Sequence, residues 1–211
     1  MEFDFGQLSH AARYKLLVST VVPRPIAWVV SQDRSGIVNA APFSFFNAIS
    51  GNPSVVVIGF GSHDGGRPKD TCANIRDTRQ FVVNLVSEDT AEKMNITAIE
   101  FEPGVNEMAE AGLTTVPSVR VKPPRIAESP VAMECEPMQI IDLGPGSTLV
   151  LGRVLMMHIR DDAVIDSAKQ LIDTPKLKLI GRMHGRGWYT RTTDRFEMPR
   201  IPLDEWRKNR G

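Results

Sequence analysis

The amino-acid sequence predicts a mainly β fold, an antiparallel barrel or sandwich with a few short peripheral helices. Apolar runs rich in β-branched residues outnumber segments with helical spacing, and the connections between them are short and rich in Gly, Pro, Asn or Asp. The strand–helix alternation of a parallel doubly wound sheet is missing. We expect one domain over residues 1–211, with a core at about 15–195 and a basic, poorly structured C-terminal tail at 196–211.

The predicted strands follow one another along most of the chain. Two prolines around Arg24 set an extended backbone before the first strand, and a Gly-Pro-Gly loop joins the last two long strands, which we expect to be antiparallel. The expected strands are 26–31, 37–50, 55–60, 81–86, 131–144 and 147–160, with a short one within 188–202.

Helical spacing and capping residues predict four short helices. Ser9 is a candidate cap for the leading helix. Ser87 precedes acidic residues, which suit the first turn of a helix, and Gly112 is placed to end another. The expected helices lie within 7–18, 70–78, 87–98 and 106–112.

Composition and charge exclude several classes of protein. The formal net charge is +0, so no overall field attracts the chain to nucleic acid or an anionic membrane. No apolar run approaches the roughly 20 residues of a membrane span, and the acidic N-terminus does not resemble a signal peptide. Cys72 and Cys135 are expected to be buried, reduced thiols. The sequence therefore predicts a cytoplasmic protein, with neither nucleic acid nor membrane as a partner.

Several motifs resemble catalytic or ligand-binding signatures but lack the required spacing. Residues 59–65 (GFGSHDG) have the pattern Gly-x-Gly-x-x-x-Gly, which is not a dinucleotide fingerprint. Adjacent Ser62, His63 and Asp64 cannot form a catalytic relay. A P-loop motif is absent, and the four histidines are dispersed. We therefore expect no metal site.

The stretch RPKDTCANI (residues 67–75) stands where a loop becomes a helix. A phosphate monoester needs several donors on one side, and a helix N-terminus supplies free N–H groups and a favourable dipole. Arg67 and Lys69 precede the expected helix, and Thr71 lies in its first turn. Asp70 would repel a phosphate, so it should cap the helix or orient one of the cations. Read alone, the stretch is equally consistent with a solvated basic turn.

Polar residues interrupt the apolar segment 37–50. Asn39, Ser44 and Asn47 either cap turns or contact a polar ligand along the strand. Ala40 and Ala41 would let a flat ring approach the backbone, although small core residues are the favoured explanation when the segment is read alone.

Two further features are candidates for ligand contact. Arg24 stands between two prolines, where it could also be a simple ion-pair residue. The stretch GRMHGRGWY (residues 181–189) is denser in glycine, arginine and aromatic residues than a turn requires. We interpret it as a loop that approaches a ligand or a partner subunit.

These motifs, in this order, closely resemble the flavin reductase-like family of FMN-binding split barrels. The matching parts are Arg-Pro-Ile at residue 24, Asn-x-x-Pro-x-Ser at residue 39, Lys-Asp-Thr at residue 69 followed by Asn74, and Phe-Val-Val-Asn at residue 81. They cover roughly residues 21–86, and the stretch at 181–191 extends the match. The ordered set is far more specific than any single motif.

The resemblance implies a Greek-key split barrel that forms a homodimer with one FMN in each subunit. Arg67, Lys69 and Thr71 would hold the phosphate. His184, the one candidate for a catalytic role, and Gly185 would approach the flavin, either of their own subunit or across the dimer interface. The remaining residues of the implied cofactor site are Arg24, Asn39, Ala41, Phe43, Ser44 and Asn74.

The implied activity is hydride transfer from NADH or NADPH to flavin. Electrons would then pass to free flavin, a partner oxygenase, oxygen or a metal complex. The flavin supplies this chemistry, which agrees with the missing catalytic cluster. One alternative is a non-enzymatic protein that stores FMN or senses redox state. Another is a pyridoxamine-phosphate-oxidase-like enzyme, for which Arg182 and Arg186 are the candidate second phosphate site.

Overall fold

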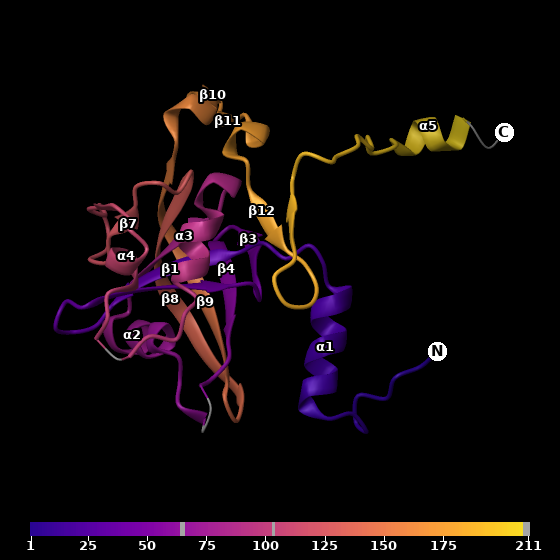
Figure 1. The fold of residues 1–211 in the computed structure, drawn as a ribbon. Helices are drawn as coiled ribbons and strands as arrows, with labels where there is room; N and C mark the ends of the chain where they lie inside the picture. Colours follow the sequence, from indigo (N-terminus) through magenta and orange to yellow (C-terminus); the bar gives the residue numbers. More distant parts are fainter. Residues whose placement is uncertain (64–65, 103, 209–211) are drawn as a thin grey trace.

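The computed structural model describes residues 1–63, 66–102 and 104–208, and its centre is one strongly curved antiparallel sheet (Figure 1). Seven strands lie in the order β2-β1-β5-β8-β9-β4-β3. Their bounds are Ala27–Gln32 (β1), Val38–Phe43 (β2), Phe46–Gly51 (β3), Ser54–Phe60 (β4), Phe81–Leu85 (β5), Val131–Gly144 (β8) and Ser147–Ile159 (β9). The prediction of a mainly β, antiparallel fold is confirmed.

The segment 37–50 forms two strands rather than the single strand that its composition predicts. The chain bends at Ser44 and Phe45, after which β2 pairs with β1 and β3 pairs with β4. The N–H of Gly59 donates to the carbonyl of Phe45 at 2.7 Å and ties the bend to β4. Because β2 and β3 lie at the two ends of the strand order, this bend connects the two edges of the sheet.

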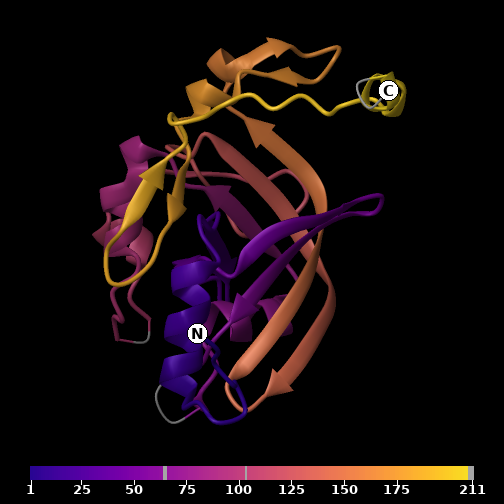
Figure 2. The same cartoon turned by 90° about the vertical axis from the view of Figure 1, so that its right-hand side faces the viewer.

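The hairpin of β8 and β9 is the longest feature of the sheet, and its prediction is confirmed. Its register shifts in three places, one of them around Pro137, which has no N–H to donate to a ladder. Such bulges bend and twist a strand pair, and Figure 2 shows the hairpin curving along the sheet. At Gly152 an added Cβ would lie 2.5 Å from Cζ of Phe81, so only glycine fits this close approach.

The helices and smaller strands surround this sheet. The predicted helices are confirmed, except that Ser87 caps a 3-10 turn, Glu88–Thr90, before the third helix begins. The helices are His10–Thr20 (α1), Asp70–Thr78 (α2), Ala91–Ile96 (α3), Glu107–Glu110 (α4) and Leu203–Lys208 (α5). Further 3-10 turns span Asp161–Ala163 and Thr174–Leu177, and the paired short strands are Thr115–Val116 (β6) with Arg125–Ile126 (β7), Val164–Asp166 (β10) with Leu171–Ile172 (β11), and Ile180–Arg182 (β12) with Tyr189–Arg191 (β13).

The C-terminal tail differs from its prediction. It contains the helix α5, so the expectation of a poorly structured tail was wrong for this part. The tail leads away from the sheet in both views, and α5 buries none of its residues (Figures 1 and 2). Residues 209–211 of the predicted tail lie outside the described part of the chain.

Strand β1 is buried on both faces, which explains why its sequence is continuously apolar. Ala27 and Val29 pack into a core with strands β3, β4, β5, β8 and β9 and with helix α2. Trp28 and Val30 point to the opposite face and pack against α3 and α4. The indole Nε1 of Trp28 donates to Oγ1 of Thr97 at 2.8 Å, which fixes the end of α3 to this strand.

The two cysteines and the absence of a long apolar helix were considered in the sequence. Cys72 and Cys135 are free and buried in the core, as expected, and burial raises the pKa of the Cys135 thiol. Among the described helices, none combines the length and the apolar character that crossing a membrane requires.

The buried carboxylate of Glu134 in β8 holds the loop between β6 and β7. Its oxygens accept the N–H groups of Val119 at 2.9 Å and of Val121 at 3.2 Å, and that of Arg120. His158 Nε2 lies 2.6 Å from the same carboxylate. Burial alone would raise the pKa of Glu134, but these hydrogen bonds outweigh burial and hold the pKa below its usual value.

We expect Glu134→Gln to lower the free energy of unfolding at pH 7 by about 1–3 kcal/mol, because an amide cannot replace every bond of the carboxylate. A carboxyl group with a lowered pKa stabilises the fold above its unfolded pKa, and this stabilisation is lost as the pH falls through the folded pKa. Denaturant unfolding at pH 7 and pH 3 should therefore show the difference shrinking in acid. Glu136→Gln, at a half-exposed ion pair with Arg153, is the control and should change little. An equal loss in both variants would contradict the assignment.

Candidate functional site

A hollow of about 140 Å³ lies between β2, the loop before α2, the first turn of α2 and the segment after α3. We call it the β2–α2 hollow. Its lining residues are Asn39, Ala41, Pro42, Phe43, His63, Lys69, Asp70, Thr71, Thr97, Ala98, Ile99, Glu100, Phe101 and Glu107. It brings together five residues of the implied cofactor site, namely Asn39, Ala41, Phe43, Lys69 and Thr71.

The first turn of α2 faces this hollow. Lys69 is the residue before the helix, and its carbonyl accepts the N–H of Ala73 at 3.1 Å. Its side chain does not cap the helix, so within the described chain the first N–H groups of α2 have no side-chain acceptor. Uncapped N–H groups, the helix dipole and the Lys69 ammonium together favour an anion.

Asp70 is the first residue of α2 and not its cap, so that interpretation of Asp70 was wrong. The alternative holds: Asp70 accepts a hydrogen bond from Arg67 at 2.8 Å. This pair is largely exposed, and Arg67 does not line the hollow. Asp70 therefore orients Arg67 near the start of the helix.

Asn39 and Thr71 join β2 to α2 across the hollow. Thr71 is buried, with Oγ1 2.8 Å from the Asn39 carboxamide. With the amide turned so that both of its ends are satisfied, Oδ1 accepts from Thr71 and Nδ2 donates to Oε1 of Glu107 at 3.1 Å. The hydroxyl and the carboxamide are thus held in place by side chains from separate elements.

Glu107 in α4 is a half-buried carboxyl group that the motif analysis did not identify. Its Oε2 accepts the N–H of Ala40 in β2 at 3.3 Å. Burial raises the pKa of Glu107, and the nearby Asp70 raises it further. The motif search missed Glu107 because a helix read on its own does not show which strand it packs against.

Lys69 has two partners in the wall of the hollow. Its Nζ is bonded to the Glu100 carboxylate and lies 3.2 Å from Nδ1 of His63. The bond from Lys69 holds the pKa of Glu100 below its usual range. Neither His63 nor Glu100 was among the predicted site residues. No pattern in the sequence links residues 31 positions apart, such as Lys69 and Glu100.

Arg24 lies outside this hollow and ties several segments together. Its guanidinium donates to the carbonyls of Val18 and Val21 at 2.8 Å and of Met183 at 3.0 Å. Its Nε is 3.4 Å from Oγ of Ser44. These bonds connect the end of α1, the β2–β3 bend and the loop after β12.

Three other predicted residues also lie apart from the hollow. Asn74 faces Ser31 of β1, with Nδ2 3.1 Å from Oγ. His184 and Gly185 lie in the exposed loop between β12 and β13, where His184 stacks on Trp188 with ring centroids 6.1 Å apart. Within one chain the structure does not bring these residues to the β2–α2 hollow.

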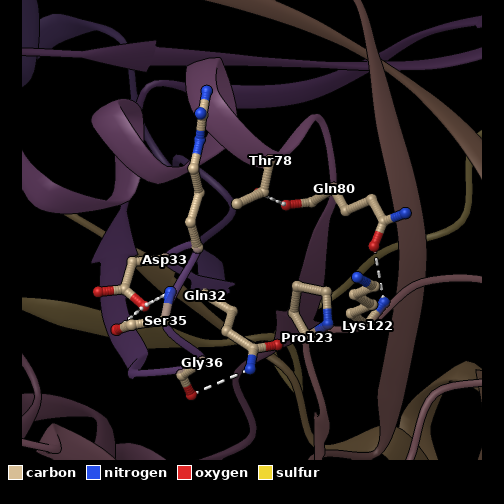
Figure 3. A pocket seen from close by; sticks show the side chains of 9 residues that line it. Gln32, Asp33, Ser35, Gly36, Thr78, Gln80, Lys122 and Pro123 are labelled. Carbon is tan, nitrogen blue, oxygen red and sulfur yellow. Dashed lines mark hydrogen bonds between the residues drawn. The ribbon is translucent and has the colours of Figure 1, made fainter.

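A larger hollow of about 440 Å³ lies at the turn between β1 and β2 (Figure 3). Most of its polar groups already bond to nearby atoms. Asp33 accepts from the N–H groups of Ser35 and Ile37, Gln32 donates to the Gly36 carbonyl, and Gln80 accepts from the N–H of Lys122. This hollow contains no predicted site residue. Its side chains stabilise the turn.

A strongly curved antiparallel sheet with a cationic helix start beside it is the architecture of a split-barrel flavin protein. The family model for the flavin reductase like domain matches residues 18–173. The chain therefore belongs to the flavin reductase-like family, whose members bind flavin.

Solved structures agree with this assignment. Nitrilotriacetate monooxygenase component B from Bacillus cereus is 30% identical, with a TM-score of 0.88 over 94% of this chain and 98% of that one. The 2-nitrobenzoate 2-nitroreductase of Pseudomonas fluorescens is 34% identical, with a TM-score of 0.86 over 96% and 97%. A Shewanella frigidimarina protein described as having a split barrel domain is 20% identical, with a TM-score of 0.80 over 95% and 100%, and supports the fold alone.

We expect Glu107→Gln to stabilise the protein at pH 7. Because the folded pKa of Glu107 is raised, the charged form is disfavoured in the fold, and stability is lost as the pH rises from the unfolded pKa to the folded one. The neutral amide removes this loss, so the Tm should rise by a few degrees at pH 7 and by less at pH 4.

Thermal unfolding followed by circular dichroism at both pH values checks this expectation. Glu110→Gln, at an exposed position of the same helix, is the matched control. A Glu107→Gln variant that is destabilised equally at both pH values would show that the carboxylate acts through its hydrogen bonds.

Proposed function

We propose that the protein is an FMN-binding oxidoreductase that uses NADH or NADPH as reductant. Electrons would pass to free flavin, a partner oxygenase, oxygen or a metal complex. The observation that carries this proposal is the β2–α2 hollow, where Lys69, Thr71 and the uncapped start of α2 face Asn39 and Ala41 of β2.

The donors in the hollow fit the phosphate of FMN. Lys69 supplies a charge and α2 its N–H groups, and Thr71 could join them by turning its hydroxyl proton from Asn39, so that several hydrogen bonds could form on one side of an anion. The ring of His63 adds a buried Nε2 without a partner in the described chain. Arg67, held by Asp70, would approach the phosphate from outside the hollow. A solvated turn does not account for a buried ring nitrogen without a partner among the described residues.

The remaining lining would hold the ribityl chain and the ring. Ala41 presents only a methyl group, which allows a flat ring close to the strand backbone, and Phe43 adds an apolar surface. Asn39 offers a polar group fixed by Thr71 and Glu107. These residues would bind and orient. When bound, the flavin supplies the redox chemistry, accepting hydride and passing electrons on.

A homodimer would account for the predicted residues that lie outside the hollow. His184 and Gly185 occupy an exposed loop, and in a dimer that loop could approach the flavin of the partner subunit. Arg24, bonded to Met183 and near Ser44, would then position this loop and the β2–β3 bend. The cytoplasmic location of the protein stays a prediction.

The similarity to a monooxygenase component B supports a partner oxygenase as electron acceptor. A pyridoxamine-phosphate-oxidase-like activity is less well supported, because Arg182 bonds to the Trp188 and Gly185 carbonyls and lies over the Tyr189 ring. Those contacts leave little of Arg182 to bind a second phosphate.

We expect Lys69→Ala to weaken FMN binding about tenfold or more, because it removes a charge-assisted hydrogen bond. Riboflavin, which has no phosphate, should lose much less affinity. Quenching of flavin fluorescence measures both. Lys93→Ala, which removes another partly exposed, ion-paired lysine outside the hollow, is the control. Unchanged FMN affinity in Lys69→Ala would overturn the phosphate assignment.

Enzymatic activity is tested by adding NADH or NADPH anaerobically to FMN-loaded protein and following the bleaching of the flavin. We expect rapid bleaching with at least one nucleotide, well above the rate with free FMN. Tight, stoichiometric flavin without bleaching would instead identify a protein that stores flavin or senses redox state.

A further inference from the structure

Lys69 is already paired with an anion in this structure. Among the described residues that line the β2–α2 hollow it is the one lysine or arginine, and its Nζ is bonded to the Glu100 carboxylate. A phosphate bound at Lys69 would have to share this ammonium with Glu100 or replace it. The carboxylate thus lies where the proposed function requires a ligand anion.

The segment that carries Glu100 is fixed at one end and exposed beyond it. Thr97 is buried and bonded to Trp28, whereas residues 98–100 and 102 are exposed. The Glu100 side chain itself is 69% exposed. A segment with few buried contacts opens at low free-energy cost, so Glu100 can leave Lys69 without disturbing the core.

His63 lies beside the same ion pair, with Nδ1 3.6 Å from Oε1 of Glu100. Its Nδ1 is 3.2 Å from Nζ of Lys69. In the tautomer in which Nδ1 accepts from this ammonium, the ring proton is on Nε2. That Nε2 is buried without an acceptor in the described chain. Bonds between His63 and both Arg67 and Gly66 fix the backbone around the ring. A buried donor without an acceptor is costly and would favour an anionic oxygen within its reach.

We propose that Glu100 is an internal anion that occupies the phosphate position of the ligand-free chain, and that a flavin phosphate displaces it and engages Lys69 and His63. The inference rests on the proposed function and adds that the ligand-free site holds an internal competitor of the phosphate. A flavin with a phosphate must replace Glu100 at Lys69, whereas riboflavin can leave the Lys69–Glu100 pair in place. Glu100 therefore lowers the affinity for FMN and leaves that for riboflavin nearly unchanged.

The first test compares Glu100→Gln with Glu102→Gln. Both variants remove one negative charge from the same exposed segment, but Glu102 does not line the β2–α2 hollow. We expect Glu100→Gln to tighten FMN binding about two- to fivefold, the range of one partly exposed ion pair, and Glu102→Gln to change it much less. Flavin fluorescence quenching at fixed ionic strength measures the affinities.

The second test concerns His63 as a positioning residue and uses a conservative variant. His63→Ala should weaken FMN binding severalfold and leave riboflavin binding nearly unchanged. His63→Gln, which keeps a donor and an acceptor, should retain most of the FMN affinity. Nitrogen-15 NMR of the imidazole in the wild-type protein should show the proton on Nε2, with a shift when FMN binds and a much smaller one with riboflavin.

The outcomes separate this inference from the function on which it rests. If the wild-type protein binds FMN no better than riboflavin, the hollow holds no phosphate and both proposals fail. If FMN is preferred but Glu100→Gln and Glu102→Gln behave alike, Glu100 is not the competing anion and the inference alone is wrong. An equal loss of both ligands in His63→Ala would mean that the ring shapes the hollow without contacting phosphate.

Discussion

The two-sided burial of β1 is the constraint on which the site depends. One face of β1 packs into the core with α2, and the other packs against α3 and α4. Through its pairing with β2 it places Asn39 and Ala41, and through Trp28 it holds Thr97. Two walls of the hollow, strand β2 and the segment after α3, are therefore both positioned by β1. The packing of the core around β1 therefore determines the shape of the hollow.

Much of the fold could be predicted because its signals are local. The β8–β9 hairpin is apparent from two long apolar runs around Gly144-Pro145-Gly146, and α2 from its spacing and its position after Lys69. The division of 37–50 into β2 and β3 could not be predicted. Both halves have strand composition, and what separates them is the choice of neighbour, β1 or β4. That choice depends on the closure of the whole sheet.

The candidate site was predictable only in part, for the same reason. Asn39, Ala41, Phe43, Lys69 and Thr71 belong to ordered motifs, and the structure brings them to one hollow. Glu100 and Glu107 come from segments without a recognisable motif, and their roles follow from contacts made in the folded chain. Asp70 shows the limit within a motif: its residue type suits a cap, but the helix begins one residue too early for that role.

The bend at Ser44 and Phe45 has a consequence for how this chain can vary. Since the residues on either side of it serve opposite edges of the sheet, a single inserted or deleted residue there would reverse which side chains face the core on one edge relative to the other. Substitutions in this segment alter the ligand site one position at a time. Changes in its length alter the closure of the barrel as well. The segment is thus free to diversify in chemistry while its number of residues stays constrained.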